Sequence, residues 1–135
     1  MSYRWNIDIA CERAEKDGMS VIRSTQTTLL LDLDDKVAVQ TLEIMAPKLS
    51  ALFSLVEQER WPSKSGIGVH VVLSCCEMKF PERVALQAAL GSDRLREALA
   101  IAMFLDGKME PSVLFKPRNA GLKAPQRAET EVVQP

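Results

Sequence analysis

The alternation of apolar and polar positions divides the chain into short elements. Residues 27–34 are rich in Thr and Leu, which predicts a strand. Between residues 36 and 60 apolar side chains recur at helical spacing, which predicts a long helix with a kink or break at Pro47. Residues 69–75 form an apolar run typical of a buried strand.

The rest of the chain has shorter patterns. Residues 4–17 predict a polar helix or an edge segment, and residues 20–24 predict a strand. Near the C-terminus, residues 112–115 predict a last strand. The segment 117–135 mixes Pro, Ala, Gly and charged residues without apolar periodicity, so we expect a flexible tail.

Two helices are expected between the strands 69–75 and 112–115. Pro81 opens the first helix, which ends at Gly91. Ser92 or Asp93 caps the second helix, which ends at Gly107. This order of elements predicts an α/β or α+β fold, with a small sheet covered by helices.

Composition bounds the class of protein. The chain has 135 residues, of which 47% are hydrophobic and 26% charged, so we expect one soluble core domain over residues 1–116. No apolar stretch reaches the length of a membrane span and no signal-peptide core is visible, so we expect a cytoplasmic protein. The three cysteines lack the spacing of a zinc site.

Charge is unevenly distributed. The net charge is −1 overall, but it is −4 over residues 1–59 and +3 over residues 60–135. Basic side chains in the second part either flank a phosphate pocket or lie on a solvated surface. These are Arg60, Lys64, Lys79, Arg83, Arg94 and Arg96.

Two carboxylates at the end of the strand 27–34 carry candidate chemistry. Residues two apart on a strand project from one face, so Asp32 and Asp34 project together. Such a pair can share Mg²⁺ or Mn²⁺, which prefers oxygen ligands and leaves positions open for phosphate oxygens. Asp35 points the other way and is expected to cap the following helix.

A glycine loop, Ser65-Gly66-Ile67-Gly68-Val69-His70, leads into the strand 69–75. Glycines let a phosphate approach backbone N–H groups closely, and His70, the one histidine of the chain, would donate a hydrogen bond to that phosphate. Lys64 stands beside the loop. If the two strands are neighbours, both motifs share one crevice that suits a divalent metal and a phosphorylated ligand.

The order of these motifs resembles the first two motifs of the archaeo-eukaryotic primase superfamily, the primase-polymerases of cells, plasmids and phages. The match spans residues 28–74, with looser similarity to about residue 116. The resemblance implies a minimal phage- or plasmid-type catalytic core with a mostly antiparallel, RRM-like sheet. It also implies that Asp32 and Asp34 bind the catalytic metals, while His70, Ser65, Gly66 and Gly68 hold nucleotide phosphate.

The activity that this resemblance implies is template-dependent nucleotidyl transfer in replication. Its ligands would be a nucleoside triphosphate, Mg²⁺ or Mn²⁺, and a single-stranded DNA or RNA template. The tail 117–135 would offer a site for a protein partner.

The third motif of the family, an acid that completes the metal site, has no clear match here. The strand 112–115 carries no carboxylate and is followed by Lys116. Asp93 is the first substitute as a metal ligand and Glu110 the second, although Asp93 can equally cap a helix. A catalytically degenerate accessory or regulatory factor, which binds nucleotide, nucleic acid or a protein, is therefore the alternative function.

A phosphatase is a further alternative. Two acids after an apolar strand also resemble the nucleophile motif of haloacid-dehalogenase-like phosphatases, in which Asp32 would attack phosphorus and Asp34 would act as the general acid. Lys36 stands where that family usually has Thr or Val. The loop that ends at His70 has no role in this hypothesis.

Overall fold

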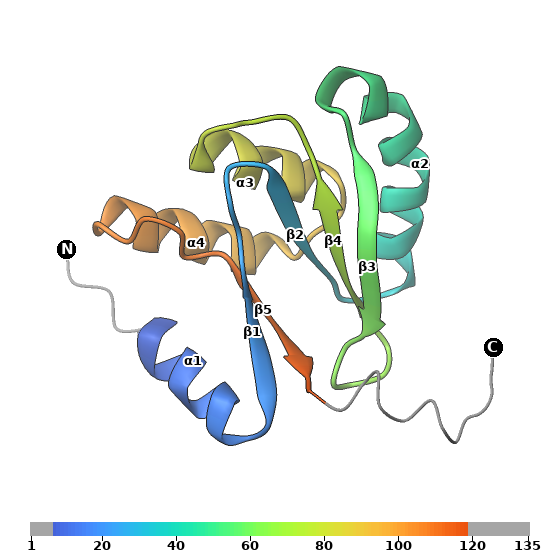
Figure 1. Ribbon diagram of the computed structural model, residues 1–135. Coiled ribbons are helices and arrows are strands. Elements are labelled where there is room, and N and C mark those ends of the chain that lie inside the picture. The colour runs from blue at the N-terminus through green and yellow to red at the C-terminus, as the bar shows by residue number, and fades with distance from the viewer. Residues whose placement is uncertain (1–6, 119–135) are drawn as a thin grey trace. The chain divides into compact units, whose positions relative to one another are not determined.

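The computed structural model describes residues 7–118, which contain four helices and five strands (Figure 1). The strands form two small antiparallel sheets. This is the α+β class that the sequence predicts. The described residues group into two compact units, a larger unit of residues 23–114 and a smaller unit of residues 7–22 and 115–118. Within this range no helix has the length and apolar character needed to cross a membrane.

The smaller unit contains α1 (Ile7–Lys16) and most of a two-stranded sheet, β1 (Met19–Arg23) with β5 (Val113–Pro117). Gly18 joins α1 to β1 with a φ of +81°, a value that glycine adopts without the steric cost of a Cβ atom. Both strands were expected from the sequence. β5 continues to Pro117, and the rest of the predicted tail, 119–135, lies outside the described residues.

The larger unit is built on a three-stranded sheet in the order β2-β4-β3. It consists of β2 (Thr28–Leu33), β4 (Val69–Ser74) and β3 (Val56–Pro62). β4 is antiparallel to both neighbours, so β2 and β3 run parallel to each other on either side of it. The connection from β2 through a helix to β3 is therefore a split β-α-β unit.

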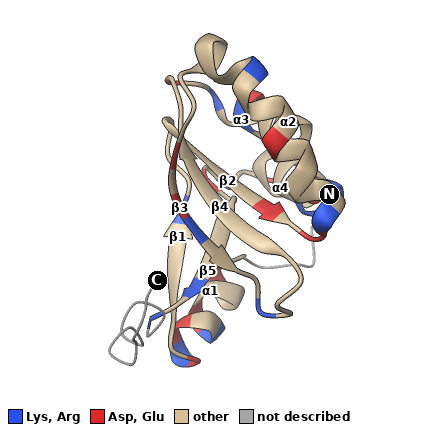
Figure 2. Cartoon of the chain, turned by 90° about the vertical axis from the view of Figure 1, so that its right-hand side faces the viewer, with Lys and Arg blue, Asp and Glu red and all other residues tan. Residues whose placement is uncertain are grey.

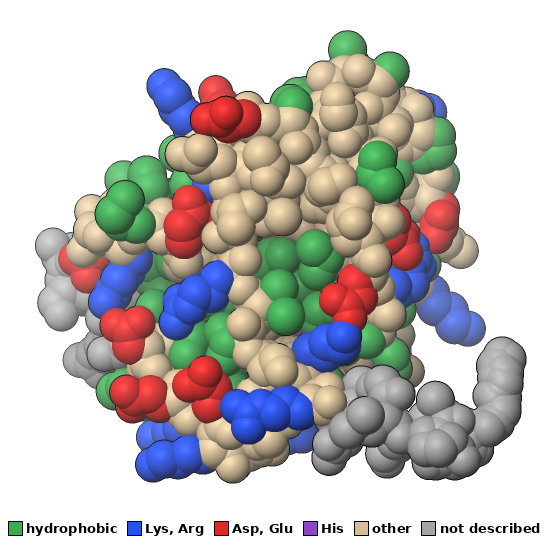
Figure 3. Space-filling view, viewed as in Figure 1, with side chains coloured by type: hydrophobic (Ala, Val, Ile, Leu, Met, Phe, Trp, Pro, Cys, Tyr) green, Lys and Arg blue, Asp and Glu red, His purple; other side chains and the backbone are tan. Residues whose placement is uncertain are grey.

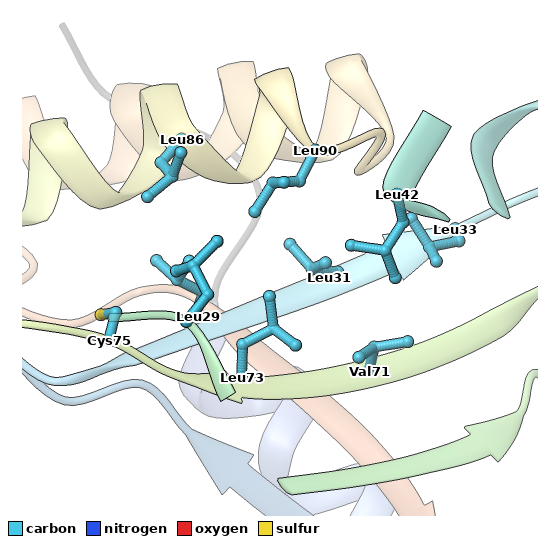
Figure 4. Packing of buried hydrophobic residues seen from close by; sticks show 10 residues of the cluster. Leu29, Leu31, Leu33, Leu42, Val71, Leu73, Cys75, Leu86 and Leu90 are labelled. Atoms are coloured by element: carbon cyan, nitrogen blue, oxygen red, sulfur yellow. The ribbon is translucent and has the colours of Figure 1, made fainter. Parts of the chain in front are cut away.

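Helices cover one face of this sheet. α2 (Lys36–Phe53) and α3 (Phe80–Ala89) lie on the same side of the strands (Figure 2). Alternate strand residues point at these helices and are fully or nearly fully buried, as expected for the apolar face of a pleated sheet (Figure 4). The cluster comprises Leu29, Leu31, Leu33, Val71 and Leu73 from the sheet with Leu42, Leu86 and Leu90 from the helices.

α2 begins as the sequence predicts. The carboxylate of Asp35 accepts a hydrogen bond from the N–H of Ala38 at 2.8 Å, which confirms the helix cap. The helix runs through Pro47 without a break. It ends at Ser54, which adopts the left-handed conformation with a φ of +56°.

The strand β3 corrects the sequence analysis, which extended the long helix to residue 60. Val56–Pro62 is instead an edge strand of the sheet, on the side opposite β2. It carries Glu57, Gln58, Glu59 and Arg60 and a register shift between Glu57 and Glu59. Charges and bulges are common on edge strands because they discourage pairing with another chain, and they also remove the alternating pattern that identifies a strand.

The two later helices occur where they were expected. α3 has Pro81 in its first turn, and Gly91 follows it with a φ of +106°. α4 (Arg94–Leu105) is capped by Asp93, whose carboxylate accepts from the N–H of Arg96 at 3.1 Å. Gly91 packs against the start of α2, since a Cβ atom there would lie 2.7 Å from the carbonyl oxygen of Ala38.

Candidate functional site

Asp32 and His70 are direct partners on the neighbouring strands β2 and β4. The Nε2 atom of His70 lies 3.4 Å from Oδ1 of Asp32. Trp61, the partner of His70 on β3, meets the imidazole edge to face with ring centroids 5.5 Å apart. Because strand residues alternate, these three side chains lie on the sheet face opposite the helices. The sequence-based expectation that both motifs meet in space is confirmed.

The surroundings of Asp32 favour its ionised form. Burial by itself raises the pKa of this carboxyl, but the hydrogen bond and charge of His70, the charge of Arg96 and a hydrogen bond with Asp34 outweigh it, so the pKa of Asp32 is lowered. Within residues 7–118 the Nδ1 atom of His70 is buried and has no hydrogen-bond partner. Nε2 is thus the imidazole atom that faces the carboxylate.

Asp34 and Asp93 add two more carboxylates next to Asp32. Burial and the negative charges of Asp32 and Asp93, together with hydrogen bonds to both, raise the pKa of Asp34 to about 6. The backbone brings Asp93 here, because its N–H donates to the carbonyl oxygen of Asp32 at 2.8 Å. Asp93 therefore caps α4 and also lies beside the acid pair, whereas its role as a metal ligand stays a prediction.

A polar cleft opens beside these acids. It has a volume of about 440 Å³ and is lined by Asp34 and Asp93, by the first turns of α2 and α4, and by the turn between α3 and α4. Asp34 is the exposed member of the acid pair, whereas Asp32 is half-buried. The cleft gives a dissolved ligand access to the carboxylate with the raised pKa.

The glycine loop forms the tip of the β3-β4 hairpin. Its backbone N–H groups are used within the turn: Gly66 donates to the carbonyl oxygen of Ser63, Ile67 to Oγ of Ser65, and Gly68 to Oγ of Ser63, at 2.9 to 3.3 Å. A ligand phosphate would have to replace these bonds. The role of Ser65, Gly66 and Gly68 in holding nucleotide, and that of the adjacent Lys64, stays a prediction.

Close packing also explains why position 68 is a glycine. A Cβ atom at this position would lie 2.5 Å from the carbonyl oxygen of Leu33 and 3.2 Å from Cα of Asp34. The glycine lets the hairpin pack tightly on the end of β2. The loop therefore contacts the acid pair through its packing.

Glu110, the second substitute for the third acid, has other partners. It accepts from Nη2 of Arg83 at 2.9 Å and from Oγ of Ser24 at 2.8 Å. Arg83 is 1% exposed and Glu110 is 35% exposed, so this pair joins a buried guanidinium to a half-buried carboxylate. Asp93, and not Glu110, thus contributes to the raised pKa of Asp34.

Several of the basic side chains expected near a phosphate pocket also have acidic partners. Arg60 pairs with Glu57 and Glu43, and Arg96 pairs with Glu97. On the face shown in Figure 3, Lys and Arg side chains are interspersed with Asp and Glu. No broad basic surface is visible on that face, and binding of a nucleic-acid template stays a prediction.

The sequence analysis did not predict a buried polar network that bonds to the backbone of Asp32. The side chains of Gln87, Ser92 and Glu97 are all at most 3% exposed, and Glu97 accepts from the other two at 2.7 Å each. Its position in the helix could have indicated that Glu97 is buried, because Glu97 shares a helix face with Ala100 and Met103, which are both buried. A charged residue within an apolar stripe indicates a buried partner.

The arrangement of possible metal-ligating side chains can be compared with what a divalent cation needs. Among residues 7–118 no group of three or more His, Cys, Asp or Glu side chains is arranged to hold a metal ion by itself.

Comparison of the chain with protein-family models, with curated proteins and with solved structures gives no match in any of the three. The resemblance to primase-polymerases therefore depends on the sequence motifs and stays a prediction.

Proposed function

We propose that the chain is a minimal primase-polymerase-like domain that binds a nucleoside triphosphate together with Mg²⁺ or Mn²⁺ and joins nucleotides on a template. The observation that carries this proposal is the placement of His70 opposite Asp32, with Asp34 and Asp93 beside them. The two motifs that suggested the family are distant in sequence and adjacent in space.

The carboxylates fit a divalent cation chemically. Mg²⁺ is usually held by one or two carboxylates, with phosphate oxygens and water completing the shell. An incomplete protein ligand set is therefore compatible with a cation that arrives with a triphosphate. Burial and the negative charges of Asp32 and Asp93 raise the pKa of Asp34, and a bound cation would relieve the repulsion between these charges.

Each residue of the site has a defined part in this proposal. Asp32 and Asp34 would hold the cation, which would supply activation of the attacking hydroxyl and positive charge for the leaving pyrophosphate. His70 orients the Asp32 carboxylate. Its Nε2–H can be shared with a phosphate oxygen, because 3.4 Å is long for a hydrogen bond to the carboxylate.

The test is a Mn²⁺ titration by calorimetry with and without a non-hydrolysable nucleoside triphosphate. Asp32→Asn and Asp34→Asn should each lower metal-linked nucleotide affinity by about tenfold or more, equivalent to about 1.4 kcal/mol. Asp35→Asn is the matched control, since it removes an adjacent charge while Asn preserves the helix cap. Equal affinity in wild type and both site variants would refute the proposed site.

A binding-only version of the same site is the second candidate. The observation that favours it is that the N–H groups of the glycine loop are already bonded within the turn. Template-dependent nucleotide incorporation separates the two candidates. Metal-linked nucleotide binding without incorporation would indicate an accessory factor, whereas incorporation that Asp32→Asn abolishes would indicate an enzyme.

The phosphatase hypothesis gives no role to His70, so the contact between His70 and Asp32 favours the primase-like proposal. Trapping of an aspartyl phosphate with fluoride analogues tests it directly. A trapped adduct on Asp32 would replace the proposed function with phosphate ester hydrolysis.

A further inference from the structure

The outer edge of β2 is closed by polar groups of α3 and α4 in place of another strand. β2 pairs with β4 on one side only. On the other side the N–H of Leu30 donates to Oε1 of Gln87 at 2.9 Å, and the N–H of Asp32 donates to Oγ of Ser92 at 3.0 Å. The carbonyl oxygens of Leu30 and Asp32 accept from Nη1 of Arg96 and from the N–H of Asp93.

Arg96 is the long side chain of this edge. Its Nη2 atom donates to Oγ of Ser112 at 3.1 Å and to the carbonyl oxygen of Val113 at 2.9 Å. Its Nη1 atom contacts Glu97 as well as Leu30. A planar guanidinium can satisfy acceptors in several fixed directions at once, which an ammonium group on a flexible stem cannot.

Glu97 holds the arginine in place. Its buried carboxylate also accepts from Gln87 and Ser92, so the three donors around it are the groups that close the β2 edge. Burial raises the pKa of Glu97, although the charge of Arg96 and the three hydrogen bonds act in the opposite direction. A network with all of its members bonded is rigid, because any displacement leaves a buried polar group unpaired.

This network reaches the candidate site both by geometry and by charge. Asp32 is bonded through its backbone to Ser92 and Asp93, and the charge of Arg96 acts on its carboxylate. We propose that Arg96, held by Glu97, is the positioning residue of the site: it fixes the free edge of β2 so that Asp32 faces His70. The role of Arg96 in ligand binding rests on the function proposed above.

The test compares Arg96→Met and Arg96→Lys with Lys48→Met, all in the full chain. Lys48 is exposed on α2 and does not line the cleft, so its removal controls for net charge. Two quantities are measured. The first is the Mn²⁺ affinity at fixed pH, and the second is the chemical shift of the His70 ring at the same pH, which needs no assignment because the chain has one histidine.

The guanidinium of Arg96 bonds the carbonyl oxygen of Leu30 on the free edge of β2 and that of Val113, so its loss should displace Asp32 from His70. Arg96→Met and Arg96→Lys should therefore both move the His70 resonance and lower Mn²⁺ affinity by about tenfold, the lower end of what groups that orient metal ligands contribute. Arg96→Lys keeps the charge and loses the fixed fork, so its effect reports geometry alone. Lys48→Met should change neither quantity.

A residue that served stability alone would lower the melting temperature and leave both quantities at their wild-type values in the folded protein. That result would overturn the inference while the proposed function stands. If the Arg96 variants do not fold, Glu97→Gln provides the same test through the His70 resonance, because Gln cannot accept all three hydrogen bonds. If wild type binds no Mn²⁺, the proposed function fails and the His70 resonance in the metal-free variants still decides the positioning role.

Discussion

Asp32 and His70 stand opposite each other on antiparallel strands, with Nε2 of the imidazole 3.4 Å from Oδ1 of the carboxylate. The pair joins the acid motif to the glycine-loop motif. It also fixes which face of the sheet carries the candidate site, since Leu31 and Leu33 on either side of Asp32 point into the core.

The energy of this pair can be measured with a double-mutant cycle. We expect Asp32→Asn and His70→Gln to show a coupling energy of about 1 kcal/mol in urea unfolding at pH 7. The pKa of Asp32 is lowered in the fold, so the stability from its ionised form is present above the unfolded pKa near 4 and is lost as pH falls through the folded pKa. Additive effects of the two substitutions would show that the side chains do not interact.

Asp34 is expected to destabilise the fold at neutral pH. Its pKa is raised to about 6, so between about pH 4 and pH 6 the folded state holds more protons than the unfolded state and stability falls as pH rises. Asp34→Asn should therefore stabilise the protein above pH 6 by ~1 kcal/mol, a value reduced for solvent screening of this exposed side chain. Thermal unfolding at pH 5 and pH 7.5 measures the difference.

The matched control for Asp34 is again Asp35→Asn, which removes the same charge from the neighbouring residue and keeps the cap on α2. It should leave the pH dependence of stability unchanged. An Asp34→Asn variant that is no more stable than wild type at pH 7.5 would contradict the acid cluster seen here.

Gly68 and Gly66 should respond differently to alanine. Gly68→Ala would place a Cβ atom 2.5 Å from the carbonyl oxygen of Leu33, so we expect a loss of about 1–3 kcal/mol and a weaker metal response at the displaced acid pair. Gly66 has a φ of +78° and open space around it. Gly66→Ala should cost about 1–2 kcal/mol from backbone strain alone.

Urea unfolding and Mn²⁺ titration of the two glycine variants give the comparison. A site that is damaged equally by both substitutions would indicate that the whole loop holds the ligand. That outcome would support the phosphate-binding role predicted for the loop and would contradict a purely structural role of Gly68.

The buried network of Gln87, Ser92 and Glu97 should make the fold sensitive to substitution of Gln87. Gln87→Leu leaves the N–H of Leu30 and an oxygen of Glu97 without partners in the interior, so the free energy of unfolding should fall by about 2–4 kcal/mol. Gln40→Leu, at an exposed position of α2, is the control and should change stability by no more than about 0.5 kcal/mol. Similar values for both variants would mean that the network does not stabilise the fold.

Local chemistry in the sequence determined most of the elements and part of the site. The run of Thr and Leu identified β2, and strand periodicity placed Asp32 and Asp34 on one face. The capping preferences of Asp35 and Asp93 located the starts of two helices. These features depend on residues within one or two turns of each other, so periodicity and caps are sufficient to predict them.

Only the tertiary structure decided which distant groups meet. The polar edge strand β3 lacks a periodic signature, and the bonds that close β2 join residues 57, 60 and 66 positions apart in the chain. The arrival of Asp93 beside Asp34 and the burial of Glu97 beside Arg96 follow from how α3 and α4 pack on the sheet. Such contacts have no local signal, because they depend on the register and the edges of a sheet that forms between separate segments.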